Sequence, residues 1–163
     1  MIVLGITNKN SIQAIIVFVL VTLFAVTANY RPQKKRNPAL ALSVIKVLKN
    51  AETDILVAPF DYILAFSFHY DKAIFSDIKP NDEYNHLENS LKNQSIYFLN
   101  NSNDLQSLAD KINRRHIVYL DAEADFYHPG NNILPELKSR FKLVKEKRFN
   151  DNLILYYFIQ GSN

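Results

Sequence analysis

The residues best suited to chemistry in this sequence lie in the stretch DAEADFYHPG. It holds three carboxylates and a histidine: Asp121, Glu123, Asp125 and His128. They follow a predicted strand at 116–121, and ligands of open α/β sheets bind beyond the carboxyl ends of strands. Such a loop could hold a hard metal ion, although the spacing matches no common ligand template. We favour helix capping and hydration, so these four residues are ligand candidates only and no metal site is predicted.

Asp61 and His69 form a second candidate pair. Asp61 follows the apolar run DILVAP at the end of another predicted strand, and His69 comes about two helical turns later. A carboxylate and a histidine could perform acid–base catalysis if they shared a cleft. We favour a structural role, in which Asp61 caps a helix and His69 lies near its end. No serine stands in a GxSxG elbow, so a hydrolase of that type has no support. We expect no catalytic residue in this chain.

The composition excludes several classes of site. The chain has no cysteine, which excludes disulfides, thiol catalysis and cysteine-ligated zinc. Its three glycines form neither a Walker loop nor a GxGxxG turn, so we expect no nucleotide and no other cofactor. Without Lys9 and the basic run RPQKKR, 14 of the 19 Lys and Arg residues remain against 16 Asp and Glu. This balance argues against nucleic acid as a partner.

A second basic run lies near the carboxyl end of the chain. It could bind an acidic partner, but its alternation with apolar residues is typical of a solvated face, which we favour. Its members are Lys138, Arg140, Lys142, Lys145, Lys147 and Arg148.

The segment Ile12 to Ala28 has no charged residue and is about long enough to cross a hydrocarbon core as a helix. Its apolar residues surround the helix, which argues against an amphipathic helix in the membrane interface. A cleaved signal peptide is the main alternative, because Val26-Thr27-Ala28 fits a cleavage site. The run exceeds the usual signal core of roughly 7–15 residues, and one basic residue, Lys9, precedes it. We therefore predict a single membrane span and membrane lipid as a partner.

Three regions follow from this division. Residues 1–30 form an N-terminal segment with a transmembrane helix at about 12–28, residues 31–37 a basic juxtamembrane linker, and residues 38–163 a soluble α/β domain. The basic residues from Arg31 to Arg36 would hold the domain in the cytoplasm under the positive-inside tendency, and they would contact lipid headgroups.

Strands and helices are expected to alternate along the domain. A helix after Pro38 and an apolar strand at 54–59 come first, and residues 60–70 form a helix. Further strands are expected at 73–77, 95–100 and 116–121. Helices lie within 79–93, at 104–114 with Asn103 or Asp104 as cap, and at 133–141. Segments 141–149 and 152–160 form a hairpin. This order predicts a mainly parallel sheet with helices on both faces and a C-terminal antiparallel hairpin.

The order of these pieces resembles a known family. The span ending in NYRPQKK, the strand DILVAP, and the close in FKLVKEKRFNDNLILYYF resemble the carboxyl end of bacterial multi-spanning glycosyltransferases. These are the enzymes similar to protein O-mannosyltransferases and the lipid A aminoarabinose transferase. The resemblance covers Gln13 to Phe158, and its motifs are structural.

The resemblance implies a terminal span and an extracytoplasmic domain of an enzyme that uses a polyprenyl-phosphate-linked sugar. The catalytic carboxylates of that family lie in a region that this chain lacks, so the chain would not transfer sugar alone and would be a fragment or a split subunit. Its partners would be a polytopic membrane protein or an acceptor glycan or lipid, with Tyr62, Tyr70 and Tyr127 as sugar-stacking candidates. The alternative is a stand-alone single-span or secreted α/β domain that binds a protein.

Overall fold

The computed structural model describes residues 38–76, 78, 82–112, 115–150 and 152–160. The predicted span, the basic linker and the region boundaries before residue 38 lie outside these residues. Among the helices that the structure describes, none is long and apolar enough to cross a membrane.

The described part of the chain folds around one five-stranded mixed sheet with the strand order β2-β1-β3-β5-β4. Strands β2, β1 and β3 are mutually parallel, whereas β5 is antiparallel to both β3 and β4. The strands are β1 (Thr53–Ala58), β2 (Ile96–Phe98), β3 (His116–Asp121), β4 (Phe141–Asn150) and β5 (Leu153–Gln160).

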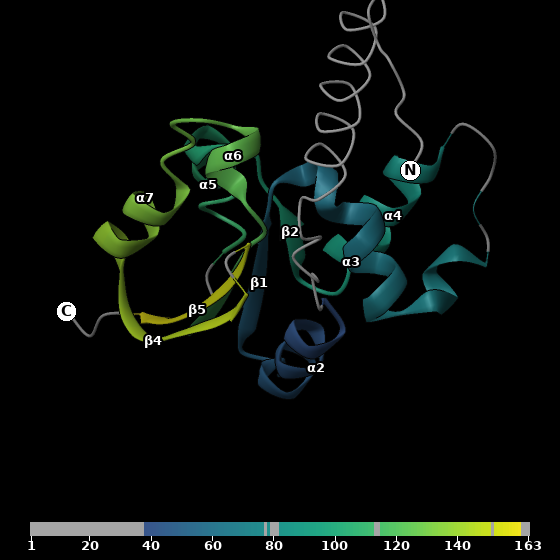
Figure 1. The fold of residues 1–163 in the computed structure, drawn as a ribbon, viewed down its shortest axis with the longest axis horizontal. Helices are drawn as coiled ribbons and strands as arrows, with labels where there is room; N and C mark the ends of the chain where they lie inside the picture. Colours follow the sequence, from purple (N-terminus) through teal and green to yellow (C-terminus); the bar gives the residue numbers. More distant parts are fainter. Residues whose placement is uncertain (1–37, 77, 79–81, 113–114, 151, 161–163) are drawn as a thin grey trace, which may run out of the picture. The chain divides into compact units, whose positions relative to one another are not determined.

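Helices cover both faces of this sheet (Figure 1). One face carries α2 (Pro38–Leu48), α3 (Ile63–Tyr70) and α4 (Glu83–Lys92). The other carries α5 (Ser102–Ser107), α6 (Ala124–Tyr127) and α7 (Ile133–Arg140). Alternate residues of each central strand enter the two cores, so Ile55 and Val57 pack under α2 and α3 while Leu56 packs toward α5.

The central strands form where the sequence is apolar on both faces. Every residue of β1 is buried, as expected for a parallel strand between two helical layers. The C-terminal hairpin is confirmed, and its outer strand β4 forms one edge of the sheet.

The prediction of a mainly parallel sheet is wrong, because the sheet has as many antiparallel as parallel pairings. One reason is the segment predicted as a strand at 73–77. Its described part lies instead in the 3-10 helix η2 (Lys72–Phe75), because the Asp71 carboxylate accepts a hydrogen bond from Ala73 N–H at 3.0 Å and starts a turn. Asp77 lies outside the described residues.

The expected cap of α5 also shifts. Asn101 is the N-cap, and its side chain accepts hydrogen bonds from the N–H groups of Asn103 and Asp104. Asp104 completes a capping box by accepting from Asn101 N–H at 3.2 Å.

Candidate functional site

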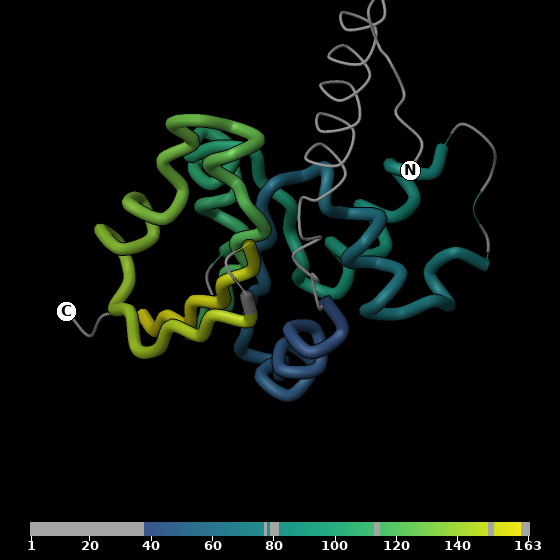
Figure 2. Tube along the Cα trace, in the orientation of Figure 1, coloured from purple at the N-terminus to yellow at the C-terminus, as the bar shows by residue number. Residues whose placement is uncertain are grey.

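The chain changes direction across the sheet at β1. From β1 it runs through α3 and α4 to β2 on one side, and it then returns through α5 to β3 on the other side, as the colours of Figure 2 trace. The segments that leave the carboxyl ends of β1 and β3 therefore diverge toward opposite faces. In open α/β sheets this switch point is the usual place of a ligand crevice.

A crevice with a volume of about 230 Å³ lies at this point, and we call it the switch-point crevice. Its walls come from the start of α2, the turn after β1 and the loop after β3. It is smaller than the roughly 300–1,000 Å³ of sites for drug-sized ligands, so it suits one ring or one unit of a polymer. The lining residues are Pro38, Pro59, Asp61, Tyr62, Ala65, Ala122 and Tyr127.

The polar and aromatic groups of the crevice come from two loops that are distant in sequence. Asp61 is exposed on the 3-10 helix η1 (Phe60–Tyr62), and Tyr127 ends α6 with 44% of its surface exposed. Tyr62 is buried and contributes part of its ring. A carboxylate accepts hydrogen bonds from hydroxyl groups, and aromatic faces bind apolar faces of flat rings. The remaining walls are proline and alanine, so the crevice is mainly apolar with one charged acceptor.

The wall that carries Tyr127 is held by two side chains. The Asp121 carboxylate at the end of β3 accepts from Ala124 N–H at 2.9 Å. Asn131 is 6% exposed; its Nδ2 donates to Asp125 Oδ1 at 2.7 Å, and its Oδ1 accepts from Ile133 N–H at 3.0 Å. These bonds fix both ends of the loop that contains α6.

Burial raises the pKa of Asp121, the hydrogen bond from Ala124 lowers it, and the negative charge of Asp125 raises it. Burial likewise raises the pKa of the neighbouring phenols, to about 12 for Tyr156 and well above the usual value for Tyr119. The two rings stack with their centroids 5.8 Å apart. Burial therefore favours the protonated, uncharged forms of Asp121, Tyr119 and Tyr156.

The four candidate ligands of the DAEADFYHPG stretch have different surroundings, and it is the Asp121 carboxylate that accepts a hydrogen bond from the local backbone. Glu123 occupies the N-cap position of α6 with φ at 67°, where its carbonyl accepts from Phe126 and Tyr127. Asp125 accepts from Asn131. The Nε2 atom of His128 is buried and has no hydrogen-bond partner among the described residues. Within the described ranges, no group of three His, Cys, Asp or Glu side chains could hold a metal ion.

Asp61 lines the switch-point crevice, whereas His69 is not among its lining residues. His69 is exposed in the last turn of α3, where its ring meets Phe68 edge-on at 5.2 Å. The expectation that Asp61 caps a helix is wrong, because Pro59 holds the N-cap position of η1 and no side chain caps it. The Asp61 carboxylate is thus left at the crevice.

Of the three tyrosines named as sugar-stacking candidates, two line the crevice and one lies in the core. Tyr62 and Tyr127 meet at the crevice. Tyr70 is buried, stacks on Phe66 at 5.2 Å and accepts a hydrogen bond from Lys49 Nζ at 3.0 Å. Tyr70 is a core residue.

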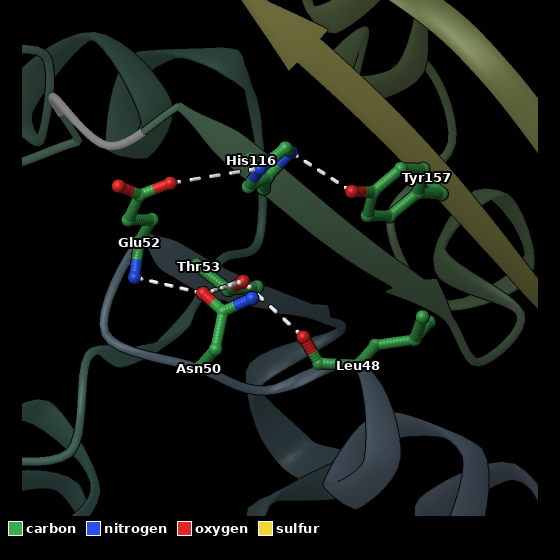
Figure 3. Close-up of polar contacts among 6 residues, drawn as sticks. All are labelled: Leu48, Asn50, Glu52, Thr53, His116 and Tyr157. Carbon is green, nitrogen blue, oxygen red and sulfur yellow. Dashed lines mark hydrogen bonds and ion pairs between the residues drawn. The ribbon is translucent and has the colours of Figure 1, made fainter.

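A polar cluster that the sequence did not reveal lies at the opposite, amino ends of β1 and β3 (Figure 3). His116 Nδ1 is 2.8 Å from the Tyr157 hydroxyl, and Glu52 lies 3.9 Å from His116 Nε2. Asn50 Oδ1 accepts from Glu52 N–H and from the Thr53 hydroxyl. The Tyr157 ring is therefore fixed in orientation, and the turn from α2 into β1 is closed.

No protein-family model, curated protein or solved structure matches this chain. The resemblance to glycosyltransferases rests on the ordered sequence patterns alone.

Proposed function

We propose that this chain is the terminal span and the extracytoplasmic domain of a membrane glycosyltransferase that uses a polyprenyl-phosphate-linked sugar. In this proposal the domain is non-catalytic and binds one sugar unit of the acceptor in the switch-point crevice. The ordered sequence patterns support the family, and the crevice supports the binding role.

The single observation that carries the binding role is the meeting of Asp61, Tyr62 and Tyr127 at the switch point. Their loops are more than 60 residues apart in the chain, and only the parallel pairing of β1 with β3 brings them together. A carboxylate beside an exposed aromatic ring can bind a sugar by accepting from adjacent hydroxyls while the ring packs against C–H groups.

Binding is tested with the full chain in a mild detergent, titrated calorimetrically with a panel of neutral and amino-sugar oligosaccharides. We expect weak binding of at least one glycan, and a loss of about tenfold or more in affinity for Tyr127→Ala and for Asp61→Asn. Phe68→Ala is the matched control, because Phe68 is 49% exposed on α3 and does not line the crevice. Equal losses in Phe68→Ala and Tyr127→Ala, or no binding to any glycan, would contradict the binding role.

The family assignment needs a separate experiment. Membrane fractionation with protease accessibility in intact and permeabilised cells should show a retained chain whose domain is reachable from outside. A domain protected on the cytoplasmic side would contradict this topology and favour the stand-alone anchored protein. Release into the soluble fraction would instead mean that Ile12 to Ala28 is a signal peptide.

A further inference from the structure

A second hollow lies between α2 and the edge strand β4 and shares no lining residue with the crevice, and we call it the α2–β4 groove. Its volume is about 320 Å³. Val44 and Leu48 of α2 form one wall, and Leu155 and Tyr157 of β5 form the floor. The Tyr157 hydroxyl is 2.8 Å from His116 Nδ1, which fixes the orientation of this ring (Figure 3).

The β4 side of the groove carries two exposed lysines, Lys145 and Lys147. A break in the β4–β5 register between Leu143 and Lys145 places them there. Leu143 pairs with Phe158 of the core beneath α7, whereas Lys145 pairs with Tyr157, which faces α2. Because a shift of one residue moves side chains to the other face, the irregularity at Val144 turns both lysines toward the groove.

The charge of these lysines is not neutralised within β4. Glu146, the single acidic residue of that strand, binds Arg148 at 3.0 Å. It pairs with Tyr156, which belongs to the opposite core, so its carboxylate belongs to the other face. The groove is thus an apolar floor with a cationic rim.

Exposed apolar side chains are present on both elements that form the groove walls. Val144 is 53% exposed and Val47 on α2 is 84% exposed. Exposed aliphatic residues beside lysines are typical of surfaces that enter the headgroup region of an anionic bilayer.

From this geometry we propose that the α2–β4 groove docks on anionic phospholipid. Lys145 and Lys147 bind the lipid phosphates, while Val144 and the apolar floor contact the glycerol and upper acyl region. This proposal concerns the folded domain and does not depend on sugar binding in the crevice.

The test uses the full chain in lipid nanodiscs. Because the chain has no cysteine, Val144→Cys and Ser139→Cys each give one labelling site for an environment-sensitive dye. Ser139 is exposed on α7, which covers the other face. In discs that contain phosphatidylglycerol, the dye at position 144 should shift to the blue and be quenched by lipid-borne quenchers. The dye at position 139 should not, and neither dye should respond in pure phosphatidylcholine.

The double variant Lys145→Glu/Lys147→Glu should reduce quenching at position 144 several-fold. The matched control, Lys72→Glu/Lys111→Glu, makes the same change in net charge at exposed residues outside the groove and should keep it. Equal quenching in both lipids, or equal losses in both double variants, would overturn the proposal. If the chain does not insert, the same labelled proteins are added to vesicles of the two compositions, with the same expected and contradicting outcomes.

Discussion

Replacing Asn131 with alanine should loosen the loop that carries Tyr127 into the crevice. The Asn131 side chain donates to Asp125 Oδ1 at 2.7 Å and to the His128 carbonyl at 3.2 Å, and it accepts from Ile133 N–H at 3.0 Å. A protein hydrogen bond contributes about 0.5–1.5 kcal/mol net, and a buried donor left unpaired costs about 1–3 kcal/mol.

The cost can be bounded from the surroundings of each partner. Asp125 is exposed and regains water, so its bond contributes at the lower end of the range. The N–H of buried Ile133 loses its side-chain acceptor and carries most of the penalty. We therefore expect Asn131→Ala to lower the free energy of unfolding by roughly 2–3 kcal/mol.

Urea unfolding of the full chain in mild detergent, followed by near-UV circular dichroism of the tyrosines, measures this change. The urea midpoint should fall with little change in slope. Asn89→Ala, at an exposed position of α4, is the control and should change stability by less than about 0.5 kcal/mol. A similar small effect for Asn131→Ala would refute the role assigned to this side chain.

An exchange of the two partners sharpens the test. Asn131→Asp places two carboxylates together and should destabilise the protein more at neutral pH than at low pH. Adding Asp125→Asn restores one donor and one acceptor, so the double variant should recover much of the loss. Additive effects of the two changes would show that the 2.7 Å contact is not coupled in solution.

Three further predictions concern the side chains of Asp121, Tyr156 and Asp104. Asn at position 121 can still accept the hydrogen bond from Ala124 N–H. In the parent protein, burial raises the folded pKa of Asp121. The stability that the protonated Asp121 contributes is therefore present below its unfolded pKa and is lost as pH rises through its folded pKa. The variant should gain stability relative to the parent in urea titrations from acid to neutral pH, and a constant difference would contradict this. Tyr156, with a pKa raised to about 12 from 10.0, should cost stability as pH rises between these values. Tyr156→Phe should reduce that alkaline loss and remove one late step of tyrosinate absorbance, and an unchanged profile would count against it. Asp104→Ala removes the acceptor of Asn100 N–H at 2.7 Å and should lower stability by about 1–2 kcal/mol in urea, whereas no change would argue against the capping box.

The sequence predicts the centre of the sheet better than its margins. The strands β1 and β3 are short apolar runs bounded by polar residues, a pattern that is typical of parallel strands buried on both faces. The segment at Ile74 and Phe75 gives the same apolar signal but is a 3-10 helix. The Asp71 turn that decides the matter lies before the run, so the local apolar pattern could not reveal it.

Two residues of the crevice, Asp61 and Tyr127, were named as candidates from the sequence, but in separate groups. Both follow predicted strands, and the parallel pairing of β1 with β3 brings the two loops to one edge of the sheet. Asn131 was not predicted, because its role depends on three partners supplied by the folded loop. Neither was the groove, since it is formed by the pairing of β4 with β5 and by the packing of α2, which the sequence of β4 alone does not give.

The helix α2 joins the two proposed sites. Its first residue, Pro38, lines the switch-point crevice, and Val44 and Leu48 line the groove. At 1.5 Å per residue, the two ends of this helix lie roughly 15 Å apart. Leu42 and Ile45 are almost fully buried against the sheet, so the helix cannot tilt without disturbing the core. A groove bound to lipid would therefore fix the crevice at a set height above the headgroups, within reach of an acceptor that is itself attached to the membrane. It follows that Lys145→Glu/Lys147→Glu should weaken the binding of a lipid-attached glycan and leave the binding of the same glycan in solution unchanged.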